Sequence, residues 1–184
     1  MNHPRYSFAM CTVAEDDGKQ YLYVSGGQDS ANQIQNSVER YDPQTNIWTE
    51  IPSMSAPRVC HGLAAVRDSA DGKLYLYAVG GYNDIDGRLK SVDRYDFETK
   101  VWSNVTDMTV ARNCPAVGVV TKADGTDTLY VFGGMLESST RSTSVEMLHT
   151  DGQLYQMNPE WSIVDRMEMT TPRGDFGVAI VTVE

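Results

Sequence analysis

Short runs of consecutive apolar and aromatic residues recur along the chain and predict β-strands. Three of them are rich in tyrosine, leucine and valine and contain no charged residue; they occupy positions 21–24, 75–79 and 129–132. Apolar side chains at consecutive positions indicate a strand that is buried on both faces of its sheet. Helix signals are absent between these runs. The pattern therefore predicts an all-β protein.

Turn residues place each of these buried runs second in a unit of four strands. Asp-Gly pairs at 17–18, 71–72 and 124–125 precede the runs and suit tight hairpin turns, because both residues tolerate positive φ. Each turn links a buried run to an earlier strand, expected at 8–13, 62–66 and 116–120. A third strand is expected at 38–41, 92–95 and 145–148. The fourth strand of each unit holds a tryptophan.

The units are copies of one repeat. In each copy the second residue of a double glycine lies nine positions beyond the Asp-Gly glycine. The residues that recur in register are the double glycines Gly26, Gly27, Gly80, Gly81, Gly133 and Gly134, the third-strand tyrosines Tyr41 and Tyr95, and the tryptophans Trp48, Trp102 and Trp161. A Met-x-x-x-Arg spacing closes each unit. The repeats are expected at 5–57, 58–111 and 112–172, with a fourth beginning at 173–184.

Sheets that are buried on both faces must be sandwiched between neighbours, and radial stacking into a β-propeller achieves this. We therefore predict one domain over residues 1–184, with three four-stranded blades and one strand of a fourth. Propellers typically have four to eight blades, so the first and third blades would each leave a hydrophobic face unpaired. Two solutions remain open: a longer chain of about six blades, or a homodimer that completes the ring, with the terminal strands swapped.

The double glycine, the third-strand tyrosine and the fourth-strand tryptophan resemble the kelch repeat over nearly the whole chain. The junction at 51–58 is most similar to that of the kelch-like (BTB–kelch) adaptor proteins. The resemblance implies a propeller that captures substrates for cullin-RING ubiquitin ligases. The third unit departs from the pattern, because Leu148-His149 replaces Tyr-Asp and a six-residue insertion precedes Trp161. An adaptor role rests on the resemblance alone.

The charge of the chain bears on its partners. The 184 residues include 15 Lys and Arg against 25 Asp and Glu, which gives a net charge of −10. Such a chain repels phosphate backbones and anionic membrane surfaces, so nucleic-acid and membrane partners are disfavoured and a basic or neutral partner is expected. No apolar run approaches the roughly 18 residues of a spanning helix. Three cysteines and an N-terminus without signal-peptide features predict a cytoplasmic location.

Candidate chemistry is sparse. The three histidines, His3, His61 and His149, fall at unrelated repeat positions, so neither a metal site nor any other cofactor is predicted. The double glycines lack phosphate-binding signatures, and no catalytic acid–base pair or nucleophile stands out. We therefore expect a protein-interaction module that binds a peptide or protein partner, and not an enzyme. The alternatives are a kelch-type copper radical oxidase, a sugar mutarotase and an actin-associated scaffold.

The resemblance also implies where a partner binds. In kelch proteins, residues just after the repeat arginine and after the double glycine tend to face the mouth of the propeller. The candidate rim here is Ser7, Gln28, Asp29, Cys60, Tyr82, Asn83, Asn113, Cys114 and Met135. The alternative for the two cysteines is a small buried filler near the axis. The loops at 28–36, 82–90 and 135–143 keep their length while their composition changes, as variable contact loops should.

The repeated aromatic residues have two interpretations. The tyrosines and tryptophans in register could line a ligand box or form the core between blades. A binding site needs differences between blades, whereas a core needs sameness. We therefore expect these rings to pack between neighbouring blades.

Overall fold

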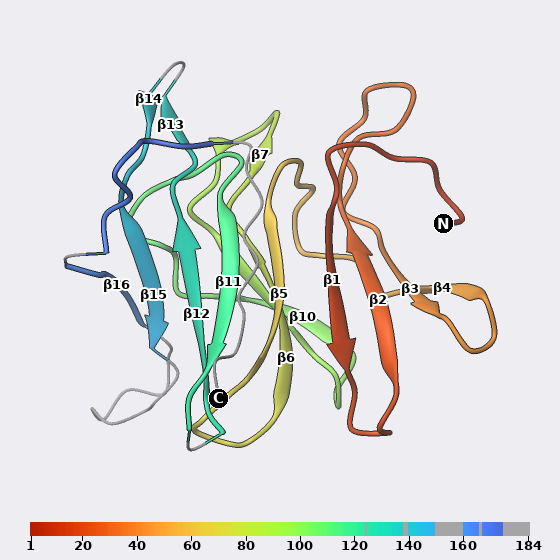
Figure 1. Cartoon of the computed structure of the whole chain (residues 1–184). Helices are drawn as coiled ribbons and strands as arrows, with labels where there is room; N and C mark the ends of the chain where they lie inside the picture. Colours follow the sequence, from red (N-terminus) through yellow and green to blue (C-terminus); the bar gives the residue numbers. More distant parts are fainter. Residues whose placement is uncertain (124, 138–139, 150–159, 166, 175–184) are drawn as a thin grey trace.

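The computed structural model describes the chain except for residues 124, 138–139, 150–159, 166 and 175–184. Its main elements are three four-stranded antiparallel sheets (Figure 1). The first contains β1 (Ala9–Ala14), β2 (Gln20–Ser25), β3 (Val38–Asp42) and β4 (Ile47–Ile51); the second β5 (Gly62–Arg67), β6 (Leu74–Val79), β9 (Val92–Asp96) and β10 (Val101–Val105); the third β11 (Ala116–Thr121), β12 (Asp127–Phe132), β15 (Val145–His149) and β16 (Glu160–Ile163).

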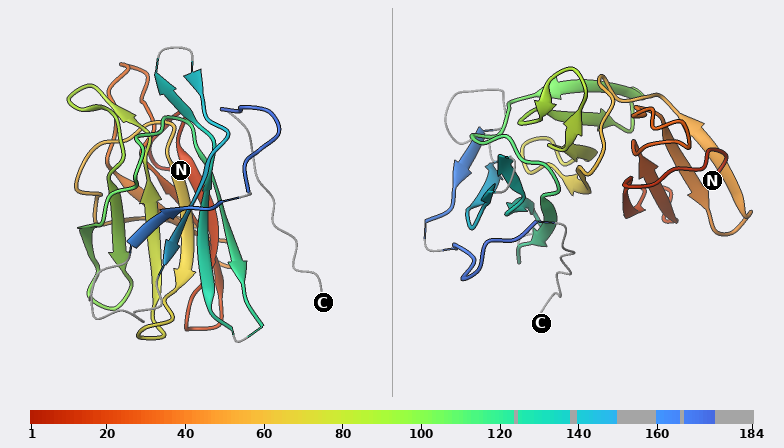
Figure 2. Two further views of the ribbon diagram at one scale, coloured as in Figure 1. Left: turned by 90° about the vertical axis from the view of Figure 1, so that its left-hand side faces the viewer. Right: turned by 90° about the horizontal axis from the view of Figure 1, so that it is seen from above.

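The predicted fold class is confirmed: the described residues form an all-β structure with three four-stranded blades. Within each sheet the strands lie in chain order, from an inner strand to an outer one. The sheets fan out along an arc, with β5 between β1 and β11 (Figure 2). The strand expected at the start of a fourth repeat falls on residues 175–184, which lie outside the described residues.

The second sheet shows why its second strand, β6, is apolar at every position. On β6, Leu76 and Ala78 pack in one hydrophobic cluster with residues of the first sheet. Tyr75 and Tyr77, which alternate with them along the strand, pack in another cluster with residues of the third sheet. Side chains alternate between the two faces of a strand, so a middle blade needs apolar residues in both phases.

The double glycines lie where neighbouring segments approach closely. Gly26 has φ 58°, and a Cβ atom there would lie 2.3 Å from the carbonyl oxygen of Arg58. Gly81 has φ 97°, and a Cβ would lie 2.7 Å from the carbonyl oxygen of Val59. Only glycine combines positive φ with such an approach at low cost.

Two short hairpins differ from the sequence prediction, which treated these segments as loops. β7 (Tyr82–Asn83) pairs with β8 (Gly87–Arg88), and β13 (Met135–Glu137) pairs with β14 (Thr140–Arg141). In the first hairpin, Gly87 adopts φ 72° and allows the tight return of the chain. These segments are too short and too polar to show strand periodicity.

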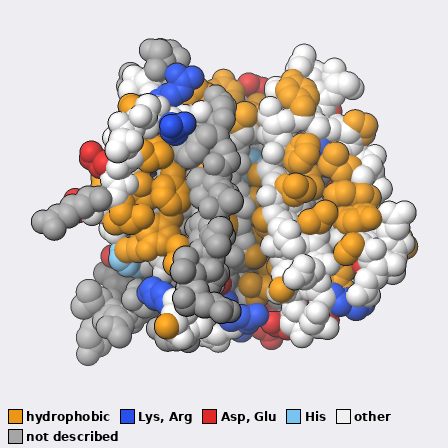
Figure 3. Space-filling view, viewed as in Figure 1, with side chains coloured by type: hydrophobic (Ala, Val, Ile, Leu, Met, Phe, Trp, Pro, Cys, Tyr) orange, Lys and Arg blue, Asp and Glu red, His pale blue; other side chains and the backbone are white. Residues whose placement is uncertain are grey.

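Among the residues that the structure describes, none covers the outward face of the first sheet. Tyr41 and Trp48 are half-buried, whereas their repeat equivalents in the second sheet, Tyr95 and Trp102, are only 2% and 9% exposed. Met10, on the inner strand of the same sheet, is 58% exposed. Hydrophobic side chains gather over β1 and β2, and again over β12 and β15 (Figure 3). The two ends of the arc thus present apolar surface.

In the part of the chain that is described, no helix has the length and apolar character needed to cross a membrane.

Candidate functional site

Three arginines of the repeat tie each double glycine to the third strand of its blade. Each is buried and donates from Nη1 to the carbonyl of the first residue of a double glycine, and each pairs with a buried carboxylate on the third strand of its blade. The pairs are Arg5–Glu39 at 2.8 Å, Arg58–Asp93 at 3.1 Å and Arg112–Glu146 at 3.0 Å. Burial lowers the pKa of Arg58 and Arg112, and the paired carboxylates oppose that shift. Guanidinium stays charged in proteins, so these are ion pairs.

Two residues beyond each arginine, the chain adopts an unusual backbone conformation. Ser7, Cys60 and Cys114 have φ of 51°, 52° and 51°, the left-handed region that non-glycine residues seldom adopt. Backbone bonds link them from blade to blade: Cys60 N donates to Ser7 O at 2.9 Å, and Cys114 N to Cys60 O at 2.8 Å. Three candidate rim residues therefore lie together in one hydrogen-bonded row.

The residue between the arginine and this row pairs with the residue after the double glycine. Tyr6 pairs with Gln28, Val59 with Tyr82, and Asn113 with Met135, each through reciprocal backbone hydrogen bonds of 2.7–3.0 Å. Four candidate rim residues, Gln28, Tyr82, Asn113 and Met135, are thus fixed beside the row of Ser7, Cys60 and Cys114.

The other two candidates shape their own loops. Asp29 Oδ1 accepts hydrogen bonds from the backbone nitrogens of Ala31 and Gln33 at 2.8 and 2.9 Å. Asn83 is 1% exposed, and its Oδ1 accepts from Ile85 N and Asp86 N at 3.0 and 2.7 Å. These oxygens are committed within the loops, so the two residues hold loop conformation at the rim.

Two exposed side chains near the rim escaped the sequence analysis. Tyr6 is 48% exposed, and its hydroxyl donates to Asn32 Oδ1 at 2.8 Å. Ile85 is 84% exposed at the turn of the β7–β8 hairpin. For Ile85, the sequence does offer one signal that could have indicated this exposure, namely a large apolar residue inside an otherwise polar loop.

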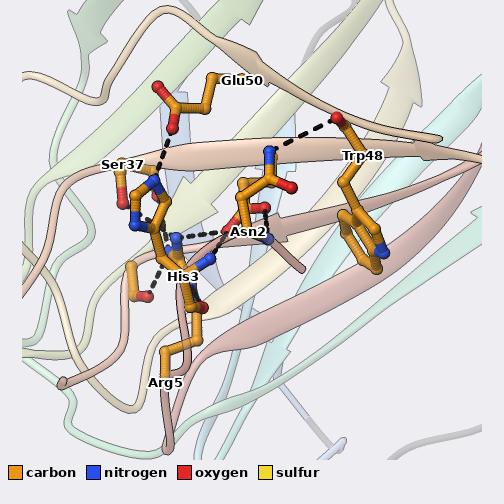
Figure 4. A network of polar contacts seen from close by, with 8 residues as sticks. Asn2, His3, Arg5, Ser37, Trp48 and Glu50 are labelled. Carbon is orange, nitrogen blue, oxygen red and sulfur yellow. Dashed lines mark hydrogen bonds and ion pairs between the residues drawn. The ribbon is translucent and has the colours of Figure 1, made fainter. Parts of the chain in front are cut away.

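The N-terminal residues contact the third strand of the first sheet in the same way as the linker between the second and third repeats contacts the third strand of the third sheet. Asn2 N donates to Glu39 Oε2 at 2.6 Å, and Thr109 N donates to Glu146 Oε2 at 2.7 Å. Asn2 and His3 lie between Arg5 and strand β4, with the Trp48 ring pointing away from this network (Figure 4). A hollow of about 250 Å³ lies beside it, lined in part by His3, Asp29, Ser37 and Glu50.

The histidines occupy three separate environments. His3 pairs with Glu50, His149 contacts Ser162 Oγ at 2.7 Å, and His61 Nε2 contacts Ser25 Oγ at 2.7 Å. Within the described ranges, no group of three or more His, Cys, Asp and Glu residues is placed to hold a metal ion. Cys60 and His61 are neighbours in the sequence but lie before strand β5, which begins at Gly62, and Cys60 has positive φ.

His61 should make stability depend on pH. Burial, and secondarily the charge of Arg58, lowers its pKa to about 3, so the folded chain keeps the ring neutral. The unfolded chain binds a proton below about pH 6.5, so stability falls as pH falls from that value toward 3. Between pH 7 and pH 5 we expect a loss of about 2 kcal/mol from this residue, measured by urea unfolding. The His61→Gln variant cannot titrate at this position, so its free energy of unfolding should fall by about 2 kcal/mol less than that of the parent chain over the same pH range. An identical dependence of stability on pH in both proteins would contradict the prediction.

Comparison with known proteins places this geometry in context. The family model described as the Attractin/LZTR1 beta-propeller matches residues 1–173. Kelch-like protein 7 of Rattus norvegicus is 39% identical over 97 residues, which cover 51% of this chain and 15% of that protein. Kelch-like protein 35 of Mus musculus is 28% identical over 144 residues, covering 78% of this chain and 21% of that protein. The matched residues thus span only 15% to 21% of the length of these relatives.

A solved structure shares the fold. The structure of YjhT aligns with a TM-score of 0.67 and 20% sequence identity, over 93% of this chain and 54% of that one. Similarity at this level of identity concerns the arrangement of the blades alone. Together with the repeat and the family match, it leads to one conclusion: the chain belongs to the kelch-repeat β-propellers of the Attractin/LZTR1 beta-propeller family and resembles the kelch-like proteins.

Proposed function

We propose that the chain is a protein-interaction module that binds a peptide or protein partner through the rim loops, in the cytoplasm and without catalysis. The observation that carries the proposal is the contrast between scaffold and loops. Arginine anchors, positive-φ residues and paired bridges recur with the same geometry, while the side chains displayed beside them differ from blade to blade. A constant frame with variable loops is suited to recognition. As the specific form of this function we propose substrate recognition for a cullin-RING ubiquitin ligase, which rests on the resemblance of the repeat to that of the kelch-like adaptor proteins.

Substitutions at the rim test this proposal. Tyr6→Ser and Met135→Ser should each reduce the partner protein retained by the immobilised chain about tenfold, because a few central contacts carry most binding energy. Ile47→Ser is the control, since Ile47 is 56% exposed at the start of the outer strand β4, outside the rim. Quantitative mass spectrometry of the retained proteins measures the effect. Equal retention by all variants would refute a rim site.

Catalysis is the competing class. A kelch-type copper radical oxidase would bind copper in stoichiometric amount and oxidise galactose, and a mutarotase would interconvert sugar anomers. We expect neither metal nor turnover from the purified chain, by metal analysis and by the two assays. Actin co-sedimentation tests the scaffold alternative. Real turnover in either assay would overturn the binding proposal.

We also propose that further blades complete the ring, from a longer chain or from a second copy. Trp102 Nε1 donates to Pro52 O at 2.7 Å and Trp161 Nε1 to Thr106 O at 3.0 Å, so each indole bonds to the last part of the preceding repeat. No such acceptor lies before Trp48 in the described part of the chain, and its face is open. An additional blade in the same register would supply one.

Light scattering separates these outcomes. The purified chain should form a dimer or larger species, or fail to unfold cooperatively, because large apolar patches are seldom left exposed on monomers. Removing residues 173–184 should weaken the association if the terminal strand is exchanged between copies. A stable monomer with a single cooperative transition would contradict both forms of the proposal.

A further inference from the structure

The β7–β8 hairpin presents an isolated apolar side chain at the rim. Ile85 is 84% exposed, the highest value among the exposed large hydrophobic side chains of the described residues. The corresponding turn in the first blade, at 30–32, is exposed but carries serine, alanine and asparagine. An exposed isoleucine offers apolar area that a partner can bury.

Hydrogen bonds hold the backbone of the hairpin turn that carries this side chain. Asn83 is buried, and its side chain accepts hydrogen bonds from Ile85 N and Asp86 N and donates to Asp86 Oδ2 at 3.2 Å. At the base, Tyr82 exchanges two backbone hydrogen bonds with Val59, of 2.9 and 3.0 Å. A turn whose backbone is already held loses little conformational freedom on binding, so more of the burial of Ile85 contributes to affinity.

The charges around Ile85 indicate what it meets. Asp84 and Asp86 flank it and are both exposed. Arg88 lies at the base of the hairpin and is half-buried, and Lys90 pairs with Asp107 at 3.4 Å. The tip itself is therefore apolar at its centre and acidic on both sides, which complements an apolar contact bordered by lysine or arginine.

From this arrangement we infer that Ile85 is the anchor of the interaction surface, and that the partner is a protein segment with a large apolar residue flanked by basic residues. The inference rests on the proposed function and specifies the partner for the same site. Ile85 packs against the partner's apolar side chain, while Asp84 and Asp86 pair with its lysines or arginines. Asn83 is a positioning residue, since it holds the tip and has no exposed surface of its own.

A phage-displayed library of random peptides, selected on the immobilised chain, tests the inference. Enriched peptides should carry basic residues beside an apolar one, and Ile85→Ser should weaken a selected synthetic peptide by about tenfold to a hundredfold. Asp84→Lys should also weaken the binding of this peptide, and the loss should be larger at low salt than at high salt, because salt screens exposed charges. Ile47→Ser is the matched control and should bind like the parent chain.

The outcomes distinguish the two levels of the proposal. Peptides that bind the parent chain and Ile85→Ser equally, or that are acidic, overturn the anchor and leave rim binding in place. The anchor is also overturned if Ile47→Ser weakens the binding of the selected peptides and Ile85→Ser does not. Failure to enrich any peptide counts against rim recognition of a peptide segment as well as against the anchor. Both isoleucines are exposed, so circular dichroism of the variants should match that of the parent chain.

Discussion

Replacing Trp102 by alanine should lower the free energy of unfolding by about 3–5 kcal/mol, the cost of removing a large buried ring from a core. The indole is 9% exposed and packs in one hydrophobic cluster with residues of the first sheet. Its ring lies 5.2 Å from that of Tyr95, and Nε1 donates to Pro52 O at 2.7 Å. The substitution thus removes contacts within its blade, contacts to the preceding blade and a hydrogen bond between repeats.

Trp48 is the natural control for this experiment. It holds the same repeat position, and its ring lies 4.9 Å from that of Tyr41. In the described part of the chain, however, its blade has no neighbour on that face, and the ring is half-buried. If no second copy covers this face, Trp48→Ala should therefore cost less than half as much as Trp102→Ala in urea unfolding. If the tryptophans formed a ligand box instead, Trp102→Ala would fold with nearly unchanged stability and lose binding. Equal, large costs at both positions would show that Trp48 is covered in solution.

The fold could be predicted because the packing requirements of one blade recur as a sequence pattern in all three repeats. Tyr75–Val79 is apolar in both phases, which only a strand between two layers requires, and three copies of the same pattern set the blade boundaries. The double glycines were equally informative, since a Cβ at Gly26 would collide with the Arg58 carbonyl. Recurrence converts a weak local signal into a strong one, because independent copies must satisfy the same packing.

The details of the rim could not be predicted in the same way. The exposure of Ile85 depends on a hairpin held by the side chain of Asn83, and two-residue strands show no periodicity. The row through Ser7, Cys60 and Cys114 depends on positive φ at non-glycine residues. Serine and cysteine seldom adopt this conformation, so the residue types do not predict it. Binding surfaces differ between copies by their nature, so repetition, the strongest signal in this sequence, carries no information about them.

The buried ion pairs lead to the second large expected effect: Arg112→Met should cost about 3–5 kcal/mol of stability, because it leaves Glu146 buried without its cation. Both side chains are fully buried, at 0% exposure each. Arg112 Nε donates to Glu146 Oε1 at 3.0 Å, while Glu146 Oε2 accepts from Thr109 N at 2.7 Å. The pair therefore joins the linker between repeats to the third strand of the blade.

Two comparisons identify the cause of that loss. Arg67→Met removes an exposed pair with Asp16 and should change stability by no more than about 1 kcal/mol, since water already solvates both charges. The double variant Arg112→Met with Glu146→Met should recover part of the loss, because no unpaired charge remains in the interior. If the double variant were as unstable as the sum of the single ones, the arginine would act mainly through its bonds to the Gly133 and Ser144 carbonyls. The ion pair would then be secondary to the backbone junction that Arg112 holds together.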